Sequence, residues 1–111
     1  MSEETLVVLV TAPTMEEAAR LGRALVEERL AACTNLVPGL RSIYRWQGAI
    51  QDDAEVLLLI KTTSAHLDRL TQRVGALHSY ETPEVLALPV AGGSLAYLDW
   101  LSLQVGPEDR S

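Results

Sequence analysis

The residues best suited to chemistry in this 111-residue chain are one cysteine and two histidines, which stand far apart in the sequence. Cys33 as a thiolate would be a soft ligand suited to Cu(I), and the imidazole of His78 is a common metal ligand in proteins. Each residue also has a structural interpretation. Cys33 can be a small buried hydrophobic residue, and His78 can interact with the C-terminal end of a helix. His66 is expected to be solvated.

No complete metal site or catalytic motif is visible in the sequence. The spacings HxH, HExxH and CxxC are all absent, so a metal site must share ligands between subunits, or use Cys33 and His78 with water and a carboxylate such as Glu84. GxSxG, a glycine-rich phosphate loop and carboxylates paired in a setting that favours catalysis are also missing. We therefore expect a binding protein and not an enzyme.

Three further residues could serve a ligand or a neighbouring subunit. Lys61 is the only lysine and ends an apolar run. It could neutralise an anionic ligand, pair with Glu55 or Glu84, or be an ordinary charge at the end of a strand. Tyr44 and Trp46 lie two residues apart and therefore share one face of an extended segment. We expect them to pack on a neighbouring subunit, as aromatic anchors do.

Apolar and β-branched runs predict the strands that must position these residues. Gly48 suits a hairpin turn between the second and third of them. Both arms of that hairpin are longer than the first strand, so the hairpin should project past the sheet. The expected strands cover residues 6–10, 35–46, 49–62 and 84–90.

Three helices are expected between and after these strands. Thr14 and Glu17 have the form of a capping box for the first helix, and Gly22 within it suits close packing. Ser64 can cap the second helix. A last helix should run from Ser94 to about Val105. Its inward-facing residues are expected to be Leu95, Leu98 and Leu101.

The predicted order βαββαβ, followed by a C-terminal helix, matches an α+β ferredoxin-like sandwich with a long hairpin between its second and third strands. The second and fourth strands form the edges in that topology. Proline cannot donate to a strand ladder, and Pro38 and Pro89 fall in those two strands. The length fits one domain over residues 1–111, and residues 106–111 are expected to form a flexible tail.

The composition points to an oligomeric protein of the cytoplasm. Three predicted strands are apolar on both faces, at 6–10, 56–60 and 85–88. One helix is too narrow to cover the second face of four strands, so a partner subunit should cover it. The net charge of −6 argues against binding nucleic acid or an anionic membrane surface. The acidic N-terminus and the single cysteine favour the cytoplasm.

Several motifs in order resemble those of the CutA divalent-cation tolerance family over residues 6–103. Two positions depart from the family pattern: Thr34, where valine is frequent, and Ser79, where proline is usual. The matching segments are Leu30–Gly39, Ser42–Gly48, Glu55, Lys61–Thr62, His78–Glu84 and Tyr97–Leu101.

The resemblance implies a cytoplasmic homotrimer of ferredoxin-like subunits, similar to the PII signalling proteins. It also implies tolerance of copper and other divalent metals, with copper binding as a proposed property and without an established enzymatic activity. The first hypothesis is therefore a metal-responsive trimer that binds copper or another divalent ion. Its ligands would be Cys33 and His78, with a carboxylate such as Glu84.

The second hypothesis is a PII-like signalling module. In that case an anionic small molecule would bind in the cleft between subunits near Lys61 and bias the hairpin. Glu55 and Tyr80 are assigned to the same cleft.

Overall fold

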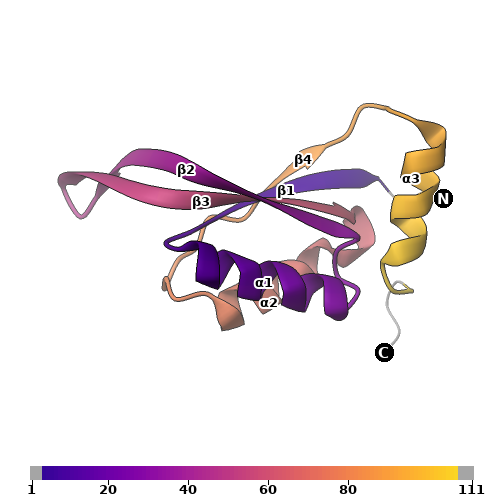
Figure 1. Ribbon diagram of the computed structural model, residues 1–111, viewed down its shortest axis with the longest axis horizontal. Helices are drawn as coiled ribbons and strands as arrows, with labels where there is room; N and C mark the ends of the chain where they lie inside the picture. The colour runs from indigo at the N-terminus through magenta and orange to yellow at the C-terminus, as the bar shows by residue number, and fades with distance from the viewer. Residues whose placement is uncertain (1–3, 108–111) are drawn as a thin grey trace.

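The computed structural model describes residues 4–107 as four strands and three α-helices in the order that the sequence predicts (Figure 1). A short 3-10 helix, η1, precedes the second α-helix. The elements are β1 (Thr5–Ala12), α1 (Met15–Glu27), β2 (Cys33–Trp46), β3 (Ala49–Thr63), η1 (Ser64–His66), α2 (Leu67–Leu77), β4 (Leu86–Pro89) and α3 (Leu95–Gln104).

The four strands form one antiparallel sheet in the order β2-β3-β1-β4. The edges are β2 and β4, which carry Pro38 and Pro89, so the positions of the prolines predicted the topology correctly. Helices α1 and α2 lie side by side against one face of the sheet (Figure 1). The fold is the predicted ferredoxin-like α+β fold.

The core lies between the sheet and these two helices. Alternate residues of β1 and β3 point toward the helices because side chains alternate between faces along a strand. Val8, Val10, Leu58 and Ile60 are completely buried there. Gly22 of α1 allows a close approach to β2, because a Cβ atom at this position would lie 2.6 Å from Oγ1 of Thr34.

The hairpin of β2 and β3 extends beyond α1 as a two-stranded arm, as predicted (Figure 1). Gln47 and Gly48 connect the strands, and both have positive φ, of 49° and 81°. This combination is typical of a two-residue type I′ turn, whose twist matches that of the strands it joins.

A bulge in β2 sets which side chains of the arm share a face. Val37 pairs with Leu57 and Leu40 pairs with Glu55, so β2 has one extra residue between these pairs. Gly39 lies in the bulge with a φ of +82°, a conformation that favours glycine. The extra residue reverses the odd–even pattern of β2. Tyr44 therefore shares a face with Glu55 rather than with the side chains that face the helices.

The capping prediction for the first helix holds in part, and the capping prediction for the second helix is wrong. The Thr14 hydroxyl accepts a hydrogen bond from the Glu17 amide at 3.1 Å, as predicted. The Glu17 carboxylate, however, accepts a hydrogen bond from the amide of Ser79, which lies in the loop after α2. Ser64 does not cap α2 with its side chain, because its hydroxyl accepts from the Glu4 amide.

Helix α3 stands at the end of the sheet and leaves most of the second sheet face open (Figure 1). It docks through Leu101, which packs with Ala32 and Val105. The prediction that Leu95 faces inward is wrong, since this side chain is 77% exposed on the first turn of the helix.

His66 holds the end of α3, and the expectation that it is solvated is wrong. Its side chain is buried, and Nε2 donates to the Gly106 carbonyl while Nδ1 accepts from the Thr63 hydroxyl. The Gly106 amide in turn donates to the Arg29 carbonyl. A flexible tail therefore does not begin at Gly106, and residues 108–111 lie outside the described residues.

Within residues 4–107, no helix combines the length and the apolar character needed to cross a membrane.

Candidate functional site

The open face of the sheet is the face opposite α1 and α2, and it carries the candidate functional residues. Its central part is apolar. Leu86 and Leu88 of β4 are 56% and 48% exposed, and Val37 of β2 is 41% exposed. Val7 and Leu88 are paired across β1 and β4, as are Leu9 and Leu86. These neighbouring apolar side chains form a continuous surface that monomers rarely leave in water.

Cys33 lies on this face at the end near α3, which we call the thiol end. Cys33 pairs with Lys61 across β2 and β3, and its thiol is 3.7 Å from Oδ1 of Asn35. The Lys61 ammonium donates to the same oxygen of Asn35. Burial raises the pKa of Tyr97 on α3, and the adjacent Cys33 raises it further through its charge and a hydrogen bond. The half-buried Cys33 thiol therefore lies beside a phenol, an amide and an ammonium group.

His78 is buried at the other end of β1, where both of its ring nitrogens are occupied. Nε2 donates to the Thr11 carbonyl at 2.7 Å, and Nδ1 accepts from the Tyr80 amide at 3.0 Å. Since a carbonyl can only accept and an amide N–H can only donate, these two bonds require the neutral tautomer with its proton on Nε2. His78 therefore has no free nitrogen for a metal in this conformation.

Glu17 fixes the same loop from the side of α1. Its buried carboxylate accepts from the Ser79 amide at 2.8 Å and lies 3.4 Å from Nδ1 of His78. Burial pushes the pKa of Glu17 upward. The hydrogen bonds from Ser79 and the charge of Arg20 outweigh this effect and hold the pKa below its ordinary value. Together, Glu17 and His78 give the loop a defined path.

That path brings Tyr80 onto the buried carboxylate of Glu55. The Tyr80 hydroxyl donates to Oε2 of Glu55 at 2.7 Å, and only 7% of Glu55 is exposed. Burial, followed by the hydrogen bond and the charge of Glu55, raises the pKa of Tyr80 well above its usual value. Tyr80 therefore stays protonated and keeps donating to Glu55 throughout the physiological range.

A groove of about 760 Å³ opens around this pair, between the loop after α2 and the arm. We call it the arm groove. Its walls combine aromatic rings and carboxylates with smaller hydroxyl and aliphatic side chains. The aromatic side chains are Tyr44, Trp46 and Tyr80, and the carboxylates belong to Glu55, Glu81 and Glu84.

The structure separates the three predicted metal ligands. Cys33 pairs with Lys61 on β3, whereas His78 binds Thr11, which pairs with Leu57. These positions are four residues, or about 13 Å, apart along β3. Glu84 lines the arm groove instead. Among residues 4–107, no three Cys, His, Asp or Glu side chains are grouped closely enough to hold a metal ion.

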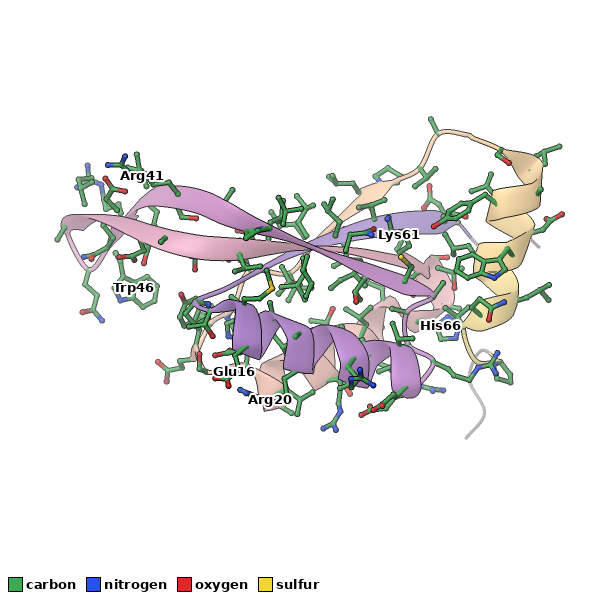
Figure 2. The ribbon with its side chains drawn as sticks, in the orientation of Figure 1. Glu16, Arg20, Arg41, Trp46, Lys61 and His66 are labelled. Atoms are coloured by element: carbon green, nitrogen blue, oxygen red, sulfur yellow. The ribbon has the colours of Figure 1, made fainter. Side chains whose placement is uncertain are left out.

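Only two of the three residues assigned to the ligand cleft lie together. Glu55 and Tyr80 are hydrogen-bonded in the arm groove. Lys61 lies six residues farther along β3, about 20 Å away, at the thiol end. Figure 2 shows Lys61 and Trp46 in these separate parts of the molecule. Tyr44 and Trp46 share a face of the arm as predicted and line the groove.

Sequence reasoning missed the role of Glu17 and the contribution of Glu81 to the groove. Glu17 stood in a capping box, a signal that also fits a carboxylate that reaches out to another loop. The run of polar residues around Tyr80 could have indicated Glu81, since binding residues are frequent in loops between rigid elements.

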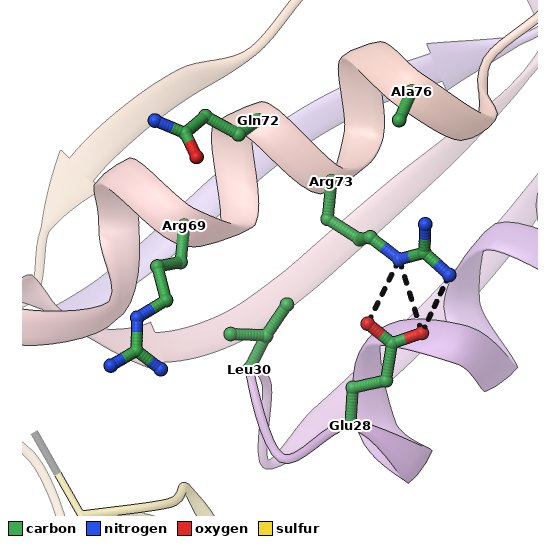
Figure 3. Close-up of a pocket in the computed structure, with 6 residues that line it drawn as sticks. All are labelled: Glu28, Leu30, Arg69, Gln72, Arg73 and Ala76. Atoms are coloured by element: carbon green, nitrogen blue, oxygen red, sulfur yellow. Dashed lines mark hydrogen bonds and ion pairs between the residues drawn. The ribbon is translucent and has the colours of Figure 1, made fainter. Parts of the chain in front are cut away.

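A second, shallower depression of about 360 Å³ lies between α2 and the residues that follow α1 (Figure 3). Its main feature is an ion pair in which the Arg73 guanidinium binds both oxygens of Glu28, with Nε at 2.9 and 3.1 Å. This exposed pair connects the end of α1 to α2 (Figure 3). We assign it a structural role.

These features define the class of protein as a small ferredoxin-like domain with an open apolar sheet face, a thiol at one end of it and a groove at the other. Residues 6–104 match the family described as CutA1 divalent ion tolerance protein. The chain belongs to this family.

Proteins of this family from bacteria, archaea, plants and animals are similar to this chain over most of its length. The divalent-cation tolerance protein CutA of Thermus thermophilus is 57% identical over 100 residues, which cover 90% of this chain and 97% of that protein. Human protein CutA is 50% identical over 92 residues, which cover 83% of this chain and 51% of the human protein. The chain thus spans nearly all of the bacterial relative and about half of the human one.

Solved structures agree with the fold. A Thermus thermophilus divalent cation tolerance protein has a TM-score of 0.90 at 56% identity, covering 92% of this chain and 99% of that one. A protein from Archaeoglobus fulgidus, described as periplasmic, has a TM-score of 0.89 at 36% identity with the same coverage.

Proposed function

We propose that this chain functions in divalent-cation tolerance as a cytoplasmic homotrimer that binds copper or another divalent ion and has no catalytic activity. The observation that carries the proposal is the open face, because Leu86, Leu88 and Val37 remain exposed in one protomer. Burying them against other copies would remove a large apolar surface from water. The family of the chain supports the link to divalent cations.

The described residues of one protomer do not form a complete copper site, so we place the metal between copies. His78 uses both nitrogens for the loop, and Glu84 faces the arm groove, which leaves Cys33 as the soft ligand. Cys33 lies on the apolar face that we expect to meet other copies. We place the site where association would bring Cys33 thiols of different subunits together, so that a bound copper ion would have thiol ligands from more than one subunit.

Two measurements test these parts separately. Light scattering at dilute concentration should give three times the mass of one chain, and the mass of a single folded chain would refute the trimer. Copper titrated under reducing conditions and followed by calorimetry should bind the parent but lose most affinity in Cys33→Ala. The matched control is Glu84→Gln, which should bind copper as the parent does. Equal binding by the parent and Cys33→Ala would remove Cys33 from the proposal without affecting the trimer.

A second candidate is the PII-like module that binds an anionic small molecule near Lys61. Its support is that Lys61 carries a positive charge on the open face, where a neighbouring copy would create a cleft. Neither of the two depressions described above is lined by Lys61, so such a site would have to form between copies. A set of anionic metabolites should then raise the melting temperature of the parent but not of Lys61→Ala.

A further inference from the structure

The arm groove has a negative charge that residues 4–107 of its own protomer do not balance. Of the described residues that line it, none is lysine, arginine or histidine. Among the ion pairs within residues 4–107, none includes Glu55, Glu81 or Glu84. The nearby guanidinium of Arg41 is held by Asp52 at 2.8 Å on the arm. The groove is therefore a concave site with unneutralised negative charge.

Glu55 is the strongest of the three carboxylates as a ligand-binding group. More than nine-tenths of the residue is buried, and burying a carboxylate is costly unless the charge is paired. Within the described part of the chain, the only hydrogen bond to this carboxylate comes from the neutral Tyr80 hydroxyl and reaches Oε2. Oε1 accepts no hydrogen bond from the described residues, and Glu55 lines the groove, so this oxygen remains available to a donor from a ligand.

The aromatic wall extends the site beyond that carboxylate. The pairing of β2 with β3 puts Tyr44 and Trp46 on the same face as Glu55, and Trp46 is 50% exposed. The Tyr44 hydroxyl donates to Asp53 at 2.6 Å, which orients its ring. An aromatic face attracts a cation placed over it, with tryptophan the strongest, and such rings beside a carboxylate are a common way to bind ammonium groups.

The geometry favours an organic cation over a bare metal ion. The three carboxylates of the groove do not form a group that could hold a metal ion, as noted for the described residues. The volume of about 760 Å³ lies within the range of roughly 300–1,000 Å³ that is usual for small-molecule sites. A metal ion would use neither this volume nor the aromatic rings.

We propose that the arm groove binds a small organic ammonium compound, with its cationic nitrogen at Glu55 and its apolar part against Tyr44 and Trp46. This site differs from the proposed metal site at Cys33 in position and in chemistry, so it does not depend on copper binding. The ligand class is also opposite in charge to the anionic molecule considered near Lys61.

Choline is a suitable probe, because 3,3-dimethyl-1-butanol has the same shape without the charge. The chain contains two tryptophans, so a ¹⁵N-labelled sample gives two indole N–H signals, and Trp46→Phe assigns them. At constant ionic strength, choline should shift the Trp46 signal and leave the Trp100 signal in place. The neutral alcohol should cause no comparable shift at the same concentration.

Glu55→Gln should weaken choline binding about tenfold, since it removes the charge and keeps the shape. Glu27→Gln, an exposed carboxylate on α1 outside the groove, is the matched control and should bind as the parent does. If Glu55→Gln fails to fold, Glu84→Lys provides a second test, because it places a competing positive charge at the exposed edge of the groove.

Three results would overturn the proposal. Equal shifts with choline and the neutral alcohol would show that charge plays no part. Unchanged affinity in a folded Glu55→Gln variant would remove the central residue. A Trp46 signal that shifts on dilution of the protein but not with choline would show that a second copy fills the groove.

Discussion

The thiol end and the arm groove lie on the same open face, but they differ in the groups that they offer. At the thiol end, Cys33 and Lys61 are surrounded by apolar strands and by Tyr97 of α3. At the arm, Glu55 lies among aromatic rings and further carboxylates. The bulge at Gly39 lies between them and changes the odd–even pattern of β2. One sheet face can therefore carry an apolar contact surface and a polar site, because a single extra residue changes which side chains it presents.

The largest expected effect concerns the apolar part of the face. Leu88→Glu should reduce the mass in solution from that of a trimer toward that of one chain, because it would bury a carboxylate in the contact between copies. Leu88 is 48% exposed in the protomer. Val26→Glu is the matched control, since Val26 is 39% exposed on α1 and lies away from the open face. Loss of assembly in both variants would argue that the open face is not the contact surface.

The second prediction is that a substitution at either end of the open face weakens the binding of one ligand and leaves the other unaffected. Cys33→Ala should weaken copper binding by tenfold or more and leave choline binding unchanged, because the two sites share no residue. Glu55→Gln should weaken choline binding about tenfold and leave copper binding unchanged. Calorimetry for copper and the Trp46 indole signal for choline measure both ligands on both variants. If either substitution affected both ligands, the two ends would have to be treated as one coupled site.

The sequence predicted the topology because a few residues have strong local effects. Pro38 and Pro89 can be tolerated only where a ladder bond is not needed, and Gly48 favours the conformation of the hairpin turn. The bulge was not predicted, since the position of an extra residue depends on the pairing of two strands and leaves little trace in either one. Because the bulge was not predicted, the sequence could not show that Tyr44 lies on the same face of the sheet as Glu55.

The candidate site was predicted less well because its contacts are long-range. Cys33, His78 and Glu84 were grouped by the chemistry of their side chains, which does not reveal distance in the fold. His78 is bound at both nitrogens by Thr11 and Tyr80, and one of these partners is 67 residues away. A histidine held by the backbone in this way has the same sequence signal as a metal ligand, so only the structure distinguishes the two.

The third prediction tests the bulge with a pair of matched glycine substitutions. Gly39→Ala should destabilise the protein by about 1 kcal/mol, because alanine is strained at a φ of +82°. Gly75→Ala in α2 should stabilise it by about 0.5 kcal/mol, since a Cβ atom there meets no other atom within 4 Å. Urea unfolding at one fixed protein concentration compares the two variants. Gly39→Ala should also weaken choline binding, with copper binding unchanged. Equal stability of Gly39→Ala and the parent would show that the bulge tolerates a side chain.

The smallest expected effect concerns the loop after α2, which forms one wall of the arm groove. It is a change in how the free energy of unfolding depends on pH. The pKa of Glu17 in the folded protein lies below its ordinary value of 4.5. Its contribution to stability is therefore complete above pH 4.5 and is lost as the pH falls through the lower folded value. Glu17→Gln can still accept from the Ser79 amide but cannot titrate, so its free energy of unfolding should change less over this acidic range. Glu16→Gln, the exposed neighbour in the same helical turn, should retain the slope of the parent in urea unfolding. If Glu17→Gln and Glu16→Gln gave the same slope, acid would act elsewhere, and the loop that carries Tyr80 would not depend on the charge of Glu17.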